Sequence, residues 1–308
     1  ALIREVVKMR SIKEPFEITE IEQASEIAYL MHVTAMKMAR PGILESEIAG
    51  AIEGIAISMG MNLSFPAIVT KNGQTLHNHY HGNKLSKGDL LLVDAGIENH
   101  RRYATDHTRT CPVGGRFSSK QRDIYNIVLD AQLKAIEAIK PGNTNKDVHM
   151  VAVETIANGL KDVGIMKGNI SMAVEKGAHA LFMPHGLGHM LGLDVHDMED
   201  LGENFVGYDD EVKRSEIFGT AFLRLGRRYQ PGFVLTVEPG CYFIPQLIEK
   251  WRSEKRFTDY INYDKVSEYL DFGGIRIEDD ILVTETGCRV LGKSIPKTVA
   301  EVEAITNT

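Results

Sequence analysis

Apolar residues recur at helical spacing in two segments near the start of the chain and in two more near its middle. The pattern predicts helices over about 19–38 and 44–59, and again over about 119–139 and 144–163. A Pro-Gly pair lies within each pair of helices, in ARPGILESEI and in IKPGNTNKDV, where one helix ends and the next begins. Both halves of the chain therefore open with the same order of elements.

Apolar runs of a different kind follow each pair of helices. The segments GDLLLVDAG and HRRYATDHTRTCPV in the first half, and FVLTVEPGCYFI and FGGIRIEDDILVT in the second, are rich in β-branched and aromatic residues. Their flanking glycines favour strands over helices. Helices and strands are grouped and do not alternate strictly, which predicts an α+β fold with antiparallel pairing.

The strand segments of the two halves align with each other. KGDLLLVDAG (87–96) lies over PGFVLTVEPG (231–240) without gaps, which places Asp94 on Glu238. TDHTRTCPVGG (105–115) lies over IEDDILVTETG (277–287), which places Asp106 on Glu278. Together with the matching helices, this order indicates an internal duplication whose period is far too long for a solenoid repeat.

The four aligned acids are candidate metal ligands. Each lies in an apolar strand segment, where an unpaired carboxylate is costly to bury. Only Arg276 and Arg109 lie close by in sequence, so bound divalent cations are the simpler compensation. Asp94 and Asp106 are separated by a segment, IENHRR, that suits a hairpin and would bring the two acids side by side. Four carboxylates suit two ions that share oxygens. The alternative is that these are ordinary acids at strand ends.

Histidines gather in two further segments. FMPHGLGHMLGLDVHD (182–197) carries His185, His189 and His196, and its glycines argue against a helix and so against the helical HExxH pattern. A glycine-rich strand or loop would let the backbone approach a ligand, although polar loop histidines remain the alternative. In LHNHYHG (76–82), alternation would place three histidines on one strand face; only His77 is taken as a candidate.

Composition narrows the functional classes. The chain has 308 residues, 43% hydrophobic and 25% charged, with a net charge of −7. These values are typical of a globular protein and give no reason to expect nucleic acid or membrane as a partner. No apolar run approaches the ~20 residues of a membrane span. Three cysteines without CxxC spacing fit a cytoplasmic location and argue against a thiolate metal site.

The motifs together resemble the pita-bread metallopeptidases, the family of prolidase, aminopeptidase P, methionine aminopeptidase and creatinase. The resemblance rests on VDAG, TDHTRT, HGLGHMLGLDVHD, LTVEPGCYFI and GGIRIED, which occur in the family's order over about 90–285. It implies the pita-bread fold, with pseudo-two-fold symmetry around an antiparallel sheet. It also implies two divalent ions held by Asp94, Asp106, His189, Glu238 and Glu278, with a bridging hydroxide as the nucleophile.

Further roles follow from the same resemblance. Glu238 would be the general base, His77 and His196 would contact substrate and stabilise the tetrahedral intermediate, His185 would line the pocket, and Arg276 would orient nearby groups. One departure is Asn78, which stands where many relatives have tyrosine. The oxygen-rich ligand set favours Mn²⁺, with Co²⁺ or Zn²⁺ able to bind.

The prolidase and aminopeptidase P branch is the best match, which implies hydrolysis of Xaa-Pro bonds. FLRLGRRYQPGFVLTVEPG resembles the stretch in which a prolidase arginine binds the free carboxylate of a dipeptide, here Arg224, unless this is an ordinary surface arginine. Residues 1–15 are expected to be a remnant or linker from a missing N-terminal domain, and 16–308 the catalytic domain. A homodimer is expected for the full-length protein. The alternative is a creatinase-like or non-catalytic member of the fold.

Overall fold

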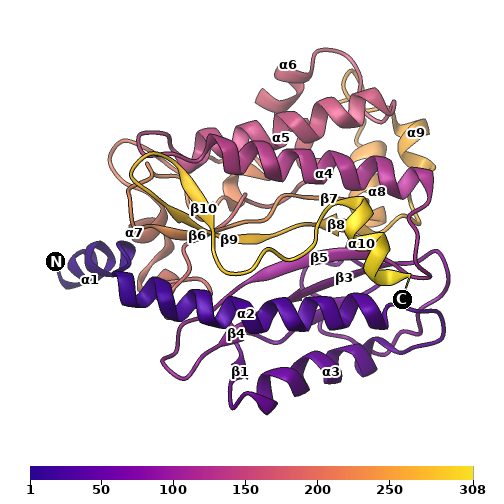
Figure 1. Cartoon of the computed structure of the whole chain (residues 1–308). Coiled ribbons are helices and arrows are strands. Elements are labelled where there is room, and N and C mark those ends of the chain that lie inside the picture. The colour runs from indigo at the N-terminus through magenta and orange to yellow at the C-terminus, as the bar shows by residue number, and fades with distance from the viewer. Residues whose placement is uncertain (308) are drawn as a thin grey trace.

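The computed structural model describes residues 1–307 and combines helices with short antiparallel sheets (Figure 1). The α-helices are α1 (Leu2–Ser11), α2 (Pro15–Met38), α3 (Glu45–Ser58), α4 (Ser119–Ala138), α5 (Asn145–Asp162), α6 (Ile170–Glu175), α7 (Glu203–Gly207), α8 (Pro245–Ser253), α9 (Tyr263–Ser267) and α10 (Val299–Thr306). The strands are β1 (Asn62–Leu63), β2 (Ile68–Thr70), β3 (Leu90–Ala95), β4 (Ile97–Glu98), β5 (His107–Pro112), β6 (Val234–Val237), β7 (Gly240–Tyr242), β8 (Gly274–Arg276), β9 (Asp279–Val283) and β10 (Cys288–Val290). Short 3₁₀ helices are η1 (Ala178–Leu181), η2 (Glu199–Leu201) and η3 (Thr220–Phe222).

The four long helices expected from the sequence are confirmed as α2, α3, α4 and α5. Side chains cap the two helices of the second half: Ser118 accepts from the backbone of Gln121 before α4, and Thr144 accepts from Asp147 before α5. In each half the glycine after the Pro residue, Gly42 or Gly142, has a φ near +95° to +98°, a conformation that side chains disfavour. The Pro-Gly pairs therefore separate the helices as predicted.

The expected antiparallel pairing is also confirmed. β3 lies between β2 and β5 in one sheet, and β9 lies between β6 and β10 in another. The β3–β5 pair of the first half corresponds to the β6–β9 pair of the second, as the internal alignment predicts. An antiparallel bridge between Thr108 and Glu278 connects the two halves.

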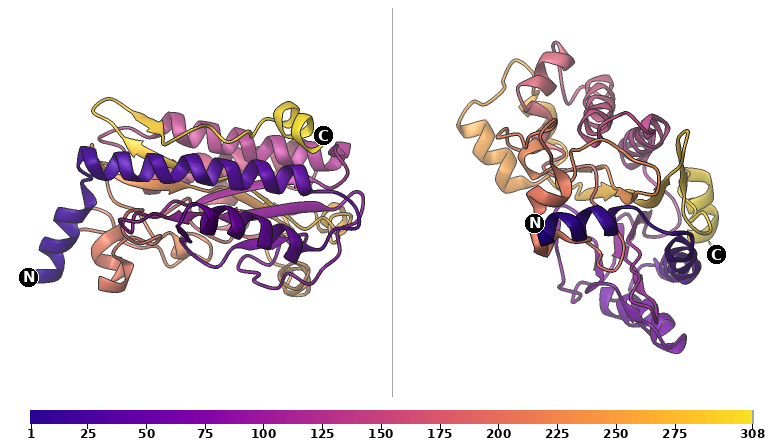
Figure 2. Two further views of the ribbon diagram at one scale, coloured as in Figure 1. Left: turned by 60° about the horizontal axis from the view of Figure 1, so that its bottom comes forward. Right: turned by 90° about the vertical axis from the view of Figure 1, so that its left-hand side faces the viewer.

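Helices cover the strands from two sides. α4 and α5 pack together above the strands in Figure 1, and α2 and α3 lie below them. The two rotated views show the same layers, with α2 running along the strand layer (Figure 2). One large buried apolar cluster contains residues from both helix layers and from the strands, so the duplicated halves share a core.

The structure differs from expectation at two places. The first residues form the helix α1, although no helix was expected within the remnant or linker of residues 1–15. The segment LHNHYHG forms turns and irregular backbone, so its three histidines do not alternate on a strand face. Among the described helices, none is long and apolar enough to cross a lipid bilayer.

Candidate metal centre

Strand register brings the duplicated acids to one place. Asp94 pairs with Thr108 across β3 and β5, and Asp106 precedes Thr108 by two residues, so alternation places all three on one face. In the second half Val237 pairs with Asp279, and the same register continued by one residue places Glu238 opposite Glu278. The Thr108 hydroxyl donates to Glu278 at 2.7 Å, which ties the two acid pairs together.

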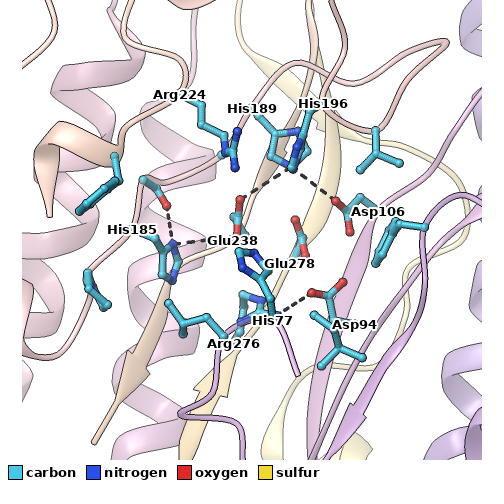
Figure 3. A pocket seen from close by; sticks show the side chains of 18 of the residues that line it. His77, Asp94, Asp106, His185, His189, His196, Arg224, Glu238, Arg276 and Glu278 are labelled. Carbon is cyan, nitrogen blue, oxygen red and sulfur yellow. Dashed lines mark hydrogen bonds and ion pairs between the residues drawn. The ribbon is translucent and has the colours of Figure 1, made fainter. Parts of the chain in front are cut away.

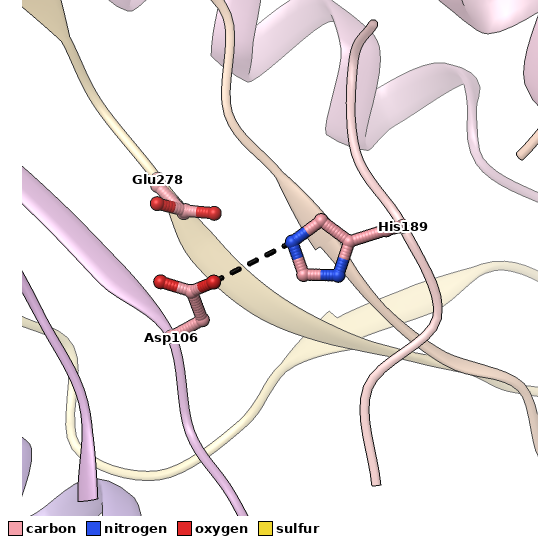
Figure 4. Close-up of side chains that lie close together, drawn as sticks. All are labelled: Asp106, His189 and Glu278. Carbon is pink, nitrogen blue, oxygen red and sulfur yellow. Dashed lines mark ion pairs between the residues drawn. The ribbon is translucent and has the colours of Figure 1, made fainter. Parts of the chain in front are cut away.

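Two of these acids and one histidine converge as a metal site requires. Asp106, His189 and Glu278 each offer a ligand atom, and these atoms lie within 4.8 Å of one another (Figure 4). His189 Nε2 is 3.4 Å from Asp106 Oδ2 and 3.8 Å from Glu238 Oε1. His189 Nδ1 lies 3.1 Å from the carbonyl oxygen of Met190, which can only accept. The proton therefore belongs on Nδ1, and Nε2 presents a lone pair to the acids.

Buried oxygens without partners support a cation at this place. Asp94 Oδ1, Asp106 Oδ1 and Glu278 Oε1 are buried, and none has a hydrogen-bond partner among residues 1–307. Such atoms lose their hydration without replacement, which is costly. Burial and the neighbouring carboxylates raise the pKa values of Asp106 and Glu278 well above their usual range. The residues present thus fit divalent cations, which would supply the missing partners.

Glycines let the histidine segment lie directly against β6. A Cβ on Gly188 would stand 1.9 Å from the carbonyl oxygen of Thr236, so only glycine permits this contact. The Thr236 amide donates to the carbonyl oxygen of His189 at 3.0 Å, and the Glu238 amide donates to that of Leu187 at 2.8 Å. No helix forms here, as predicted, and the close backbone approach that these glycines allow is to β6, whereas approach to a ligand had been expected.

Arg276 and His185 meet at a tyrosine that the sequence analysis missed. Arg276 donates to Asp94 Oδ2 at 2.6 Å and to the Tyr242 hydroxyl at 2.9 Å. The same hydroxyl lies 2.9 Å from His185 Nε2. Because His185 Nδ1 faces the carbonyl oxygen of Gly186 at 2.7 Å, Nδ1 holds the proton and Tyr242 donates to Nε2. Burial lowers the pKa of His185 to about 3, so this imidazole is neutral.

A cavity of about 720 Å³ contains all of the candidate site residues (Figure 3). His77 lines it, and burial and the charge of Arg276 lower the pKa of His77. The His196 ring stands edge-on to His189 with centroids 4.4 Å apart. His79 also lines the cavity, although it was not a candidate, whereas His81 Nε2 lies 3.0 Å from the Ala67 carbonyl oxygen.

Arg224 lies at the cavity and Arg109 does not. Arg224 lines the cavity and pairs with Glu199 at 2.5 Å. Arg109, the other arginine close in sequence to the four acids, pairs with a different carboxylate. It is buried and pairs with Asp279 at 2.6 Å. The Arg276–Asp94 pair therefore provides the fixed positive charge nearest the acids.

Without metal, we expect Glu238 to contribute less to the stability of the protein as the pH rises from about 4.5 to about 7. Burial raises the pKa of Glu238 to about 7, from an ordinary value near 4.5. At this side chain the folded protein then binds more protons than the unfolded chain, so the contribution of Glu238 falls as the pH rises, whereas buried histidines such as His185, whose pKa is lowered, contribute the opposite trend. Thermal unfolding of chelated wild type and of a Glu238→Gln variant at several pH values isolates the Glu238 contribution, and we expect the difference between their Tm values to change by several degrees.

The Glu238→Gln variant lacks the titrating group, so the Tm of the wild type should fall relative to that of the variant as the pH rises. With saturating Mn²⁺ this difference should reverse, because metal binding requires deprotonated carboxylates. A chelated wild type whose Tm tracks that of Glu238→Gln at every pH would contradict the assignment.

A sequence model described as metallopeptidase family M24 matches residues 19–285. The chain is 34% identical to human Xaa-Pro dipeptidase over 97% of its own length and 61% of that protein. It is 38% identical to Xaa-Pro aminopeptidase of Haemophilus influenzae, over 97% of this chain and 62% of that one.

The solved structures that the chain resembles include aminopeptidases P. The chain superposes on Escherichia coli aminopeptidase P in complex with substrate (a Glu383Ala variant) with a TM-score of 0.80 and 36% identity. That match covers 98% of this chain and 60% of the other. Zn-substituted E. coli aminopeptidase P in complex with product matches with a TM-score of 0.79 and 35% identity, over 97% of this chain and 60% of that one. The chain thus spans about three fifths of the length of the relatives described here.

Proposed function

Because the chain belongs to metallopeptidase family M24 and has its α+β pita-bread fold, we propose that it hydrolyses Xaa-Pro bonds with two divalent metal ions. The observation that carries the proposal is the convergence of Asp106, His189 and Glu278, with Asp94 and Glu238 lining the same cavity. Relatives named Xaa-Pro dipeptidase and Xaa-Pro aminopeptidase, over 30% identical, support the substrate class.

The metal ligands in this proposal are Asp94, Asp106, His189, Glu238 and Glu278. When bound, two divalent ions would polarise the scissile carbonyl and lower the pKa of an attacking water. Oxygen-rich ligation with a single imidazole favours Mn²⁺. Asp106 and Glu278, one buried acid from each pair, are the residues proposed to serve both ions.

Residues of the chain would transfer protons and orient the substrate. Glu238 is proposed as the general base, since burial raises its pKa to about 7, near neutral pH. Arg276 holds Asp94 through a 2.6 Å contact and so fixes a ligand. His77, His185 and His196 line the cavity around the acids, where an imidazole could hydrogen-bond the substrate and stabilise developing charge.

The cavity also suits a proline ring. Its wall includes apolar side chains such as Phe65, Ile68 and Val195 beside the acids and histidines. A proline nitrogen in a peptide bond carries no N–H, so recognition has to come from ring packing and from groups around the carbonyl. Arg224 at the cavity wall is proposed to bind the free carboxylate of a dipeptide through its planar fork of donors.

We expect chelated protein to lose turnover of Ala-Pro and to regain it when Mn²⁺ is added. The loss should be at least about a thousandfold, because both carbonyl polarisation and water activation depend on the ions. Metal content and initial rates, measured on one sample, test this. Comparing Ala-Pro with Ala-Pro-Ala then distinguishes a dipeptidase from an aminopeptidase. A protein that binds no divalent metal, or cleaves neither peptide when loaded, would overturn the proposal.

A further inference from the structure

Four charged side chains of alternating sign form a line at one wall of the cavity, where Arg214, Glu203 and Arg224 line the cavity and Glu199 lies behind Arg224. Arg214 pairs with Glu203, and the second oxygen of Glu203 lies 3.9 Å from Arg224 Nη1. The same Nη1 donates to Glu199 Oε2 at 2.5 Å, and this oxygen lies 3.8 Å from His196 Nδ1. The line therefore connects the proposed carboxylate-binding arginine to a histidine that stands against the metal ligand His189.

Among the described residues, only one of the three guanidinium nitrogens of Arg224, Nη1, contacts other side chains through hydrogen bonds or ion pairs. Its Nη1 atom makes the contacts with Glu199 and Glu203, while Nε and Nη2 have no hydrogen-bond or ion-pair partner among residues 1–307. Its side chain is 35% exposed, and it extends from its loop into the cavity (Figure 3). The Nε–Nη2 edge is the pair of parallel donors that a carboxylate prefers. One edge of the guanidinium is thus available to a ligand while the other corner is occupied.

The charge of Arg224 is already balanced. Two arginines, Arg214 and Arg224, alternate with two glutamates, Glu203 and Glu199, so the line has no net charge. The Glu199 side chain is only 11% exposed, so water screens its charge weakly. A ligand carboxylate on the free edge of Arg224 would lie beside the Glu199 carboxylate and be repelled by it. Glu199 therefore opposes the ligand that Arg224 would attract.

We propose that Glu199 is a specificity-determining residue that weakens the preference of this cavity for a free α-carboxylate. The inference rests on the proposed function, in which Arg224 binds that carboxylate. With Glu199 charged, Xaa-Pro peptides with and without a carboxylate directly after proline bind with similar affinity. When residue 199 is uncharged, the cavity prefers Xaa-Pro dipeptides to peptides without a carboxylate directly after proline. It also binds free proline more tightly, because this product carries the same carboxylate.

The Glu199→Gln variant tests this, because glutamine keeps an acceptor oxygen for Arg224 Nη1 and removes only the charge. On Mn²⁺-loaded protein, KM for Ala-Pro should fall about tenfold, the scale of removing one nearby like charge. KM for Ala-Pro amide should stay within about twofold, because the amide has no charge to repel. Any effect on His196 should change kcat for both substrates alike and leave their KM ratio unaffected.

A matched control lies in the same segment. Glu211 pairs with Arg228 and both are exposed outside the cavity, so Glu211→Gln should leave both KM values unchanged. Glu199→Gln should have no effect on KM for Ala-Pro when Arg224 is also replaced by alanine, because no arginine then holds the substrate carboxylate beside residue 199. An equal fall in KM for both substrates, or no fall for Ala-Pro, would overturn the role of Glu199.

Binding of L-proline, measured by calorimetry on the same Mn²⁺-loaded variants, separates this inference from the proposed activity. Tighter proline binding by Glu199→Gln than by wild type supports the inference, and equal or weaker binding refutes it. A wild type that cleaves neither substrate refutes the proposed function, yet the proline measurement still decides the role of Glu199. If Arg224→Ala changes neither proline binding nor the KM ratio, the carboxylate role of Arg224 and this inference both fail.

Discussion

Replacing Asp106 with asparagine is expected to lower kcat/KM for Ala-Pro at least about a thousandfold. Asp106 is one of three side chains whose ligand atoms lie within 4.8 Å of one another, and it is 5% exposed. Asparagine keeps the shape of the side chain but loses the charge and one of the two oxygens that could serve two ions. Metal content should fall together with the rate, and it is measured on the same preparation.

The same substitution should not destabilise the metal-free protein. Burial and the charge of Asp94 raise the pKa of Asp106, so the folded protein without metal disfavours the ionised form. A neutral amide removes that repulsion, and urea unfolding of chelated Asp106→Asn should give an unfolding free energy equal to or above the wild-type value. Asp130→Asn, at an exposed site paired with Lys134, is the control. More than a tenth of wild-type activity in Asp106→Asn would contradict a metal-ligand role.

Replacing Arg276 with methionine should destabilise the metal-free protein by about 3–5 kcal/mol, the usual effect of leaving a buried charge unpaired. Arg276 is 4% exposed and contacts Asp94 at 2.6 Å, the Tyr242 hydroxyl at 2.9 Å and the Thr108 hydroxyl at 3.1 Å. Methionine fills similar space without charge, so the main loss is the partner of Asp94. Denaturant unfolding of chelated protein gives the difference in free energy.

A double variant identifies the cause. Asp94→Asn added to Arg276→Met removes the stranded charge, so part of the lost stability should return, while activity should stay low because a proposed metal ligand is gone. A double variant no more stable than Arg276→Met would show that packing, and not the ion pair, accounts for the loss.

The sequence predicted the elements whose signals are local. Helix boundaries follow from apolar spacing and Pro-Gly pairs, and α2 to α5 match within a few residues. The pairing of β3 with β5 follows from two apolar runs joined by a short connection, and the β6–β9 pair from its duplication. Because strand register fixes the face of each side chain, the acid pairs could be anticipated from alternation and alignment alone.

Other parts of the site depend on distant segments with no periodic pattern. The backbone between Leu191 and Phe233 is mostly irregular with short helical turns, and it carries His196, Glu199 and Arg224. Partners of charged side chains in such a segment are chosen by tertiary packing, which spacing does not encode. Tyr242 is a partial exception, because it follows Glu238 by four residues and alternation could have placed both on one face.

The bridge between Thr108 and Glu278 has a consequence for biosynthesis. A chain emerging from the ribosome N-terminus first presents Asp94 and Asp106 long before Glu278 has been translated. The proposed set of metal ligands is therefore complete only after both duplicated halves have docked, so metal capture at this site would follow folding and would not guide its early steps. Arg276 is translated just before Glu278, so Asp94 has neither its arginine partner nor the proposed ions until the second half has been synthesised.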